Sequence, residues 1–139
     1  MTDDNIRLVQ RVYELLSTRG VNVRAIEEMV DEGLAAPDGK IDFRGAYDDG
    51  ELVQGLSEFA RYLESQPWGR SLRFEPEGYE AIDEERVFVP IRLTGAGAAS
   101  GVPVEVRGAH VVTIRAGRVV LVQSFRDREA ARASLAETG

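Results

Sequence analysis

The segment Arg107–Arg128 constrains the fold of this chain most, because it predicts two long strands joined by a tight turn at Ala116-Gly117. Side chains alternate between the two faces of a strand, so His110 shares a face with Gly108 and Val112. That face is otherwise apolar and is expected to look inward. An imidazole placed there must be hydrogen-bonded or belong to a site.

The alternation of side chains with a period of two residues, which is typical of strands, extends over most of the second half of the chain. Short connections between its strands predict an antiparallel meander. The predicted strands are Leu72–Ile82, Val87–Thr94, Val102–Arg115 and Arg118–Phe125.

The first half follows helical spacing instead. It predicts three helices, which begin near Thr2 or Asp3, near Asn22 and near Leu56, and end near Gly20, near Gly33 and before Pro67. Between the second and third helices we expect a short strand at Ile41–Phe43 and turns at Pro37-Asp38-Gly39 and Asp48-Asp49-Gly50. A last short helix is expected to be capped by Asp127. Helices followed by a run of strands indicate an α+β fold class with the helices on one face of the sheet.

The composition excludes several kinds of function. The chain has 139 residues and a net charge of −7, which indicates one domain and disfavours nucleic acid and anionic membranes as partners. The longest uncharged run, Leu93–Val104, is too short to span a membrane, and the acidic N-terminus is unlike a signal peptide, so we expect a cytoplasmic protein. Cysteine is absent and there is one histidine, so we expect no metal site and no cofactor.

The last predicted strand, Arg118–Phe125, is mainly apolar on both of its faces. The N-terminal helices can cover only one face of a sheet, so the other face is expected to pack against a second subunit. This predicts a homodimer, unless the C-terminal helix covers that surface.

The strand pair G-A-H-V-V-T-I-R-A-G-R-V-V, followed by S-F-R-D-R-E-A-A, resembles the SnoaL-like branch of the nuclear transport factor 2-like superfamily. That superfamily includes ketosteroid isomerase, polyketide cyclases and limonene epoxide hydrolase. The segment R-V-F-V-P-I-R-L-T-G-A-G-A-A-S-G-V is similar to small bacterial members without an assigned reaction. The resemblance covers essentially the whole chain. It implies a single SnoaL-like domain over residues 1–139, with three N-terminal helices packed on the concave face of a curved antiparallel sheet, a cone-like α+β barrel of the cystatin-like kind.

In this family a cavity between the helices and the sheet performs the chemistry, and the resemblance places His110 at a polar position of that cavity. Similar cyclases have a histidine there, and steroid isomerases an aspartic acid that helps to stabilise an enolate. The acid/base aspartate of the cyclases corresponds to Ser124, and the base of the isomerase to Ala36 or Phe43, depending on register. The last-strand aspartate of the epoxide hydrolases is missing as well. These vacant positions count against catalysis, whereas the inward histidine counts for it.

The candidate catalytic residues are His110, Ser124 on the same face of the neighbouring strand, and Asp42, the acid nearest to the isomerase base position. Alternation puts Asp42 on the face opposite to its neighbours, where it is expected to be solvated. Apolar side chains of the first and third helices are expected to line the cavity, with Ser124 or a backbone carbonyl as the nearest polar partner of His110 and with space left beside its ring by Gly108. The expected substrate-binding residues are Tyr13, Phe43, Phe59, Leu63, Trp68 and Val112.

Two functions remain open. The first is a cyclase- or isomerase-type enzyme that acts on an apolar carbonyl compound through enolate chemistry, with His110 as hydrogen-bond donor or acid. The second is a non-catalytic ligand-binding or dimeric scaffold protein of the same fold. In both readings the partner is a small apolar molecule with a polar or carbonyl group.

Overall fold

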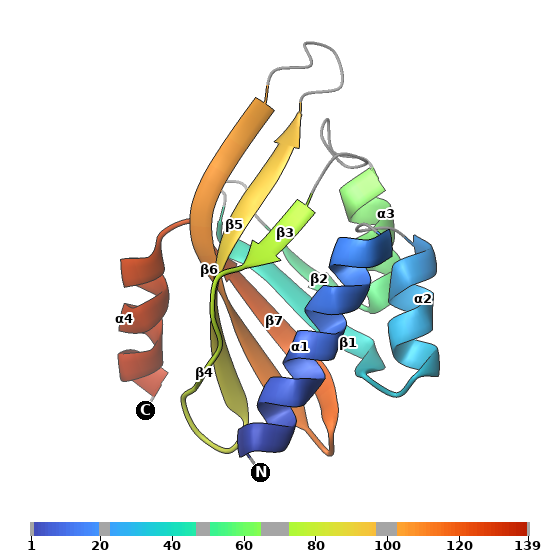
Figure 1. Cartoon of the computed structure of the whole chain (residues 1–139), viewed down its shortest axis with the longest axis horizontal. Helices are drawn as coiled ribbons and strands as arrows, with labels where there is room; N and C mark the ends of the chain where they lie inside the picture. Colours follow the sequence, from blue (N-terminus) through green and yellow to red (C-terminus); the bar gives the residue numbers. More distant parts are fainter. Residues whose placement is uncertain (1, 20–22, 47–50, 65–72, 97–102, 139) are drawn as a thin grey trace.

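The structure is a computed structural model that describes residues 2–19, 23–46, 51–64, 73–96 and 103–138. Figure 1 shows three N-terminal helices on one side of a sheet and a C-terminal helix on its other side. The helices are α1 (Thr2–Arg19), α2 (Val23–Asp31), α3 (Leu56–Glu64) and α4 (Arg128–Thr138). The strands are β1 (Ala35–Gly45), β2 (Leu52–Gln54), β3 (Arg73–Pro76), β4 (Glu80–Ala81), β5 (Arg86–Ala96), β6 (Pro103–Arg115) and β7 (Arg118–Phe125).

The strands form one mixed sheet in the order β2-β1-β7-β6-β5-β3, with β4 also paired to β5. Strands β5, β6 and β7 form the predicted antiparallel meander, in which His110 lies opposite Val89 on one side and Ser124 on the other. Strand β1 joins the sheet beside β7 in a parallel pair. The α+β class and the meander are therefore confirmed, and the parallel pair makes the sheet mixed.

Two of the predicted strands differ clearly from the structure, and β2 is a strand that the sequence did not predict. The predicted strand Leu72–Ile82 is broken into β3 and β4, and the backbone N–H of Glu77 between them donates to the carbonyl of Pro90 over 2.7 Å. The strand predicted at Ile41–Phe43 is longer and extends over the whole of β1. The segment Pro37-Asp38-Gly39, which was expected to form a turn, lies inside β1, where the register of β1 against β7 shifts. A bulge of this kind bends a strand without ending it.

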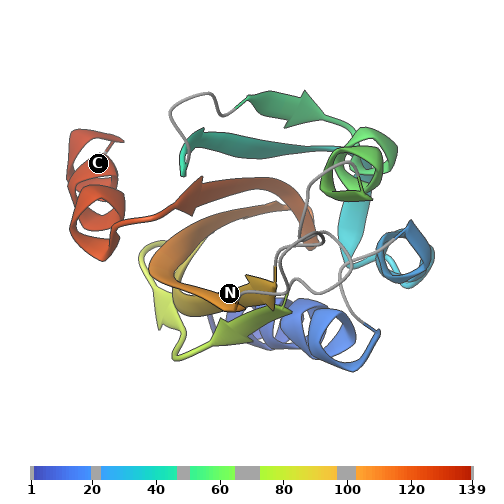
Figure 2. The ribbon, with the colours of Figure 1, turned by 90° about the horizontal axis from the view of Figure 1, so that it is seen from above.

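The main core lies between the concave face of the sheet and helices α1, α2 and α3. Seen from above, the sheet curves, and α4 lies on the opposite side from α2 and α3 (Figure 2). Helix α2 ends at Asp31, close to the predicted end near Gly33, and the φ of +74° at Gly33 is the left-handed conformation typical of the residue that follows a helix. Buried side chains from α1 (Val9), α2 (Ile26), α3 (Phe59) and the sheet (Val89) meet in one cluster. This packing confirms the expected position of the three helices.

The convex face of the sheet is partly covered by α4, which begins after the predicted cap: the N–H of Glu129 donates to Oδ1 of Asp127 over 2.8 Å. Ala131 packs there with Phe88, Ala109 and Val111. This helix thus covers part of the surface for which a second subunit was expected, and the homodimer stays a prediction.

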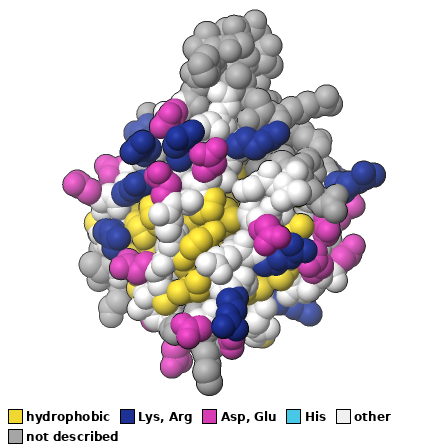
Figure 3. Space-filling model, viewed as in Figure 1, with side chains coloured by type: hydrophobic (Ala, Val, Ile, Leu, Met, Phe, Trp, Pro, Cys, Tyr) yellow, Lys and Arg dark blue, Asp and Glu magenta, His cyan; other side chains and the backbone are white. Residues whose placement is uncertain are grey.

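The charged residues near the convex face are largely paired. Arg128 donates to the carbonyls of Gly108 and Ile91 over 3.0 and 3.1 Å, and Arg132 pairs with Glu80 at 2.9 Å. On the side of the molecule that has α1 in front, basic and acidic side chains are interspersed (Figure 3). None of the helices in the described part of the chain is both long and apolar enough to cross a membrane.

Candidate functional site

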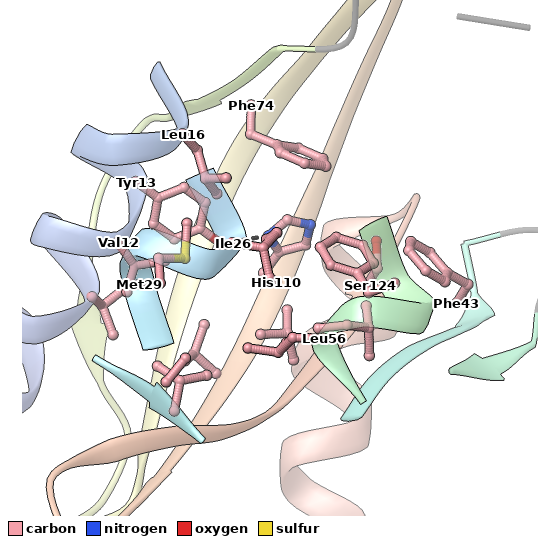
Figure 4. Close-up of a pocket in the computed structure, with 17 residues that line it drawn as sticks. Val12, Tyr13, Leu16, Ile26, Met29, Phe43, Leu56, Phe74, His110 and Ser124 are labelled. Carbon is pink, nitrogen blue, oxygen red and sulfur yellow. Dashed lines mark hydrogen bonds between the residues drawn. The ribbon is translucent and has the colours of Figure 1, made fainter. Parts of the chain in front are cut away.

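A cavity of about 70 Å³ lies between the concave face of the sheet and the three N-terminal helices (Figure 4). Of the residues predicted from the sequence, Tyr13, Phe43, Phe59, Val112, His110 and Ser124 line it. Its other lining residues are Val9, Val12, Leu16, Ile26, Met29, Ala35, Ile41, Leu56, Phe74, Val119 and Val122. Among all of the lining residues, only the side chains of Tyr13, His110 and Ser124 carry a nitrogen or oxygen atom, so the cavity is almost wholly apolar.

The two polar groups at the centre of the site belong to different elements. The hydroxyl of Tyr13 on α1 is hydrogen-bonded to Nδ1 of His110 on β6, and both residues are buried. Their rings are nearly parallel, with centroids 5.9 Å apart and an interplanar angle of 22°. Phe74 of β3 meets the imidazole edge-on at 5.1 Å. Packing and one hydrogen bond therefore fix the orientation of the imidazole.

Burial sets the charge of both groups. It lowers the pKa of His110 from 6.5 to about 4, because a buried imidazolium would lose its hydration. It also raises the pKa of Tyr13 well above its ordinary value, mainly through desolvation of the phenolate. Both groups are consequently neutral at pH 7, and the hydroxyl keeps its proton.

The hydrogen bond also selects the tautomer of the imidazole. The buried hydroxyl of Tyr13 needs an acceptor, and Nδ1 of His110 is the one the described residues offer. We therefore assign the hydroxyl as donor, which places the ring proton on Nε2. Figure 4 shows this second nitrogen on the side of the ring away from Tyr13, toward Ser124 and Phe43. The site presents a single N–H donor to an apolar cavity.

The expectation that Ser124 or a backbone carbonyl is the nearest polar partner of His110 is wrong, because α1 brings the hydroxyl of Tyr13 to the ring. Ser124 lies opposite His110 across β6 and β7 and lines the cavity, but among the described residues it makes no hydrogen bond to the imidazole. A hydrolytic Ser-His pair would require that bond. Ser124 is thus a half-buried polar residue that lines the cavity.

The expectation that Gly108 leaves space beside the ring is wrong as well. A Cβ atom at this position would lie 2.1 Å from the backbone oxygen of Phe125. Glycine is required here because the end of β7 passes directly against β6. The close approach of the two backbones occupies the space that a side chain at residue 108 would fill.

Asp42 does not line the cavity. Its neighbours Ile41 and Phe43 are buried on the inner side of β1, whereas its carboxylate accepts two bonds of 2.9 Å from the guanidinium of Arg44. That pairing, chiefly the side-chain hydrogen bonds, lowers the pKa of Asp42. Asp42 thus lies on the predicted face, but the expectation that it is solvated is wrong, because its side chain is only 13% exposed beside Arg44. Its lowered pKa makes it a poor proton acceptor.

Two of the predicted binding residues are not placed. Trp68 lies outside the described residues, and of Leu63 only its position in α3 is described. Phe74 was missed as a neighbour of the histidine, although its place between Arg73 and Glu75 is the alternation that marks an inward position. Nothing local in the sequence pairs Tyr13 with His110.

The lining limits what the site can do. No carboxylate lines the cavity among the described residues, and within them no three acidic or histidine side chains gather as metal ligands do. What the described lining offers is a buried hydrogen-bond donor in an apolar, water-poor space. Such a donor can bind a carbonyl oxygen and can stabilise negative charge that develops on it.

Several solved structures have the same fold as this chain. A SnoaL-like polyketide cyclase from Jannaschia sp. CCS1, assigned provisionally, is 19% identical, superposes with a TM-score of 0.68, and the match covers 96% of this chain and 92% of that one. TerC, co-crystallised with polyporic acid, is 19% identical with a TM-score of 0.67 over 96% and 98% of the two chains. A provisionally assigned ketosteroid isomerase from Kribbella flavida DSM 17836 is 19% identical with a TM-score of 0.64 over 89% and 78%.

At these identities the structural likeness establishes the fold alone. No curated protein matches the chain. The model of the SnoaL-like domain matches residues 9–122, which include Tyr13, His110 and most of the cavity lining. The chain therefore belongs to the SnoaL-like domain family.

Proposed function

We propose that this domain binds a small apolar molecule whose carbonyl oxygen accepts a hydrogen bond from Nε2 of His110. The observation that carries the proposal is the buried, neutral imidazole, which Tyr13 holds at Nδ1 and whose Nε2, without a hydrogen-bond partner among the described residues, faces an apolar cavity. A buried donor without a partner costs about 1–3 kcal/mol. A ligand with an acceptor at that point recovers this energy, and a hydrocarbon does not.

The size of the cavity restricts what enters without a rearrangement. Its volume of about 70 Å³ is below the roughly 150 Å³ of an apolar cavity known to hold benzene. The lining includes Met29, whose unbranched side chain can change rotamer at low cost. A small cyclic ketone is therefore a suitable probe, and its binding requires a modest movement of the lining.

The test is titration with cyclohexanone and, separately, methylcyclohexane, followed by the NMR signals of the imidazole and by calorimetry. Cyclohexanone is expected to bind more tightly, by about three- to tenfold, because the energy recovered at the buried donor is partly offset by the hydration that the ketone oxygen loses. His110→Phe, which fills the cavity and removes the donor, is expected to abolish binding of both compounds.

Thr113→Val is the matched control. Thr113 is a buried polar residue of the same strand whose side chain does not line the cavity, so this variant should bind like the wild type. Equal affinities for ketone and hydrocarbon would contradict the role of the donor. Unchanged binding in His110→Phe would contradict the site itself.

The Tyr13–His110 pair favours a second candidate function, stabilisation of an enolate as in a cyclase or isomerase. The same Nε2–H donor would bind the developing oxyanion. Since no described lining residue is a carboxylate, proton abstraction would have to use another base. Exchange of the α-protons of cyclohexanone with D₂O separates the two functions, because binding alone leaves the exchange rate at that of the buffer, and catalysis raises it in the wild type but not in His110→Phe.

A further inference from the structure

The sheet edge formed by β3 and β4 is interrupted beside the Tyr13–His110 pair. Both strands pair with β5, and α1 lies next to them (Figure 1). The pairing runs from Pro76 opposite Ile91 in β3 to Glu80 opposite Phe88 in β4. The three residues 77–79 therefore face two residues of β5. One extra residue on one of two paired strands is a β-bulge, and a bulge re-aims the side chains that follow it.

The bulge decides which face Tyr79 occupies. In β3 the even-numbered positions face the main core, to which Phe74 belongs. Without the extra residue, the odd-numbered Tyr79 would face outward. Beyond the bulge the odd-numbered positions face inward instead, because Ala81 lies opposite Val87 of the main core. Tyr79 is accordingly one of the partly buried side chains that pack against that core.

The inward ring of Tyr79 meets the ring of Tyr13. Their centroids are 6.3 Å apart and their planes lie at 63°, an edge-to-face contact. The same Tyr13 ring stacks on His110 and is hydrogen-bonded to its Nδ1. Tyr79 does not line the cavity. Its contact can therefore act on the imidazole through Tyr13.

The bulge is held by contacts to β5 and to the C-terminal helix. The N–H of Glu77 donates to the carbonyl of Pro90 over 2.7 Å, and its carboxylate accepts a hydrogen bond from the guanidinium of Arg128. Arg128 is the first residue of α4 and also donates to the carbonyls of Gly108 and Ile91. One side chain thus ties α4, β5, β6 and the bulge together.

We infer that Tyr79 is a positioning residue for the Tyr13–His110 pair, and that the ion pair of Glu77 with Arg128 holds Tyr79 in place. This inference deepens the proposed function and rests on it for its effect on ligands. Tyr79 limits how far the Tyr13 ring can turn. When that ring turns, its hydroxyl leaves Nδ1, the imidazole proton can occupy either nitrogen, and Nε2 is a donor in part of the molecules.

The first test follows the ¹⁵N signals of the imidazole in the protein without a ligand. His110 is the one histidine of the chain, so its signals are unambiguous. In the wild type the two nitrogen signals are expected to lie far apart, as in a single tautomer. Tyr79→Ala removes the ring and should bring the two signals closer together as the tautomers mix. Tyr79→Phe keeps the ring and should retain the signals of the wild type.

Tyr62→Ala is the matched control. Tyr62 is another half-buried tyrosine, which packs on Phe43 with ring centroids 4.9 Å apart and does not line the cavity. Its loss should lower stability and leave the imidazole signals unchanged. The positioning role is refuted if Tyr62→Ala changes the signals as much as Tyr79→Ala does, or if Tyr79→Phe does.

Glu77→Gln tests the link to α4. It changes an exposed side chain, so the inference stays testable even if Tyr79→Ala does not fold. The signals should move in the same direction as in Tyr79→Ala, by less. Added to Tyr79→Ala it should have no further effect, because its influence passes through Tyr79. Glu75→Gln, which breaks the pair with Arg92 at 3.2 Å on the regularly paired part of β3, should change nothing. Unmoved signals in Glu77→Gln, or additive changes in the double variant, contradict the link.

Ligand binding gives the last readout and separates the two claims. The three- to tenfold preference of the wild type for cyclohexanone over methylcyclohexane should fall toward one in Tyr79→Ala and persist in Tyr79→Phe. If Tyr79→Ala keeps the preference, the inference is overturned while the proposed function stands. If the imidazole signals respond as expected but cyclohexanone does not bind to the wild type, the proposed function fails while the positioning of the pair by Tyr79 stands.

Discussion

As the pH falls, protonation of His110 should destabilise this protein before protonation of its carboxylates does. The pKa of the buried imidazole is about 4 in the folded chain and about 6.5 in an unfolded one. Between these values the unfolded state holds a proton that the folded state does not, so stability falls as the pH falls from 6.5 toward 4. One pKa unit is worth about 1.4 kcal/mol, so the full effect is about 3 kcal/mol, of which about 2 kcal/mol is lost between pH 7 and pH 5.

Urea unfolding at the two pH values measures this difference as a shift in the free energy of unfolding. His110→Gln is the control, because glutamine does not titrate; its stability at pH 7 is lower, but it should lose little more on going to pH 5. Asp42 and Asp83, whose pKa values are lowered, lose their contributions only nearer pH 4 and below. The burial argument is refuted if the wild type and His110→Gln lose the same free energy over this interval.

Three substitutions test other parts of the structure. Tyr13→Phe removes the hydroxyl bonded to the imidazole and should cost about 1–3 kcal/mol in urea unfolding, with a change in the ¹⁵N shifts of the ring that a purely structural loss would not produce. Gly108→Ala places a Cβ atom against the backbone oxygen of Phe125 and should cost about 3 kcal/mol or more, whereas Gly78→Ala, whose Cβ would have only an ordinary contact of 3.6 Å, should be mild. Ala116→Asn should stabilise the hairpin by about 1 kcal/mol, seen as a higher melting temperature, because Ala116 has a φ of +53° that asparagine tolerates better. An unchanged or lower melting temperature would show that the turn is not strained.

Local patterns in the sequence were sufficient to predict most of the fold. Strict alternation placed His110 on the inner face of β6, and Ala116-Gly117 set a two-residue turn, with Arg115 opposite Arg118. The turn predicted at Pro37-Asp38-Gly39 failed because the pairing of β1 with the distant β7 keeps this segment extended, through a bulge. Turn propensity is a local quantity, and here the sheet overrides it.

The site was predicted less completely, for a related reason. His110 and most of the apolar lining follow from periodicity, since an inward face must meet the helices. The hydrogen bond from Tyr13 joins residues 97 positions apart, and it depends on how α1 crosses the sheet. No spacing rule encodes that crossing. The steric role of Gly108 likewise depends on where the end of β7 lies.

The position of β7 has a consequence for how the protein is made. Although β7 is the last strand of the chain, it lies in the interior of the sheet between β1 and β6. Until Arg118–Phe125 leaves the ribosome, β1 and β6 each keep an unpaired edge, and pairing β1 with β7 then closes a loop of more than half the chain. Slow folding and exposure to aggregation during synthesis are expected of such a topology. A nascent or truncated chain that stops before Arg118 also lacks Val119, Val122 and Ser124, so the cavity has no complete wall until β7 has been made.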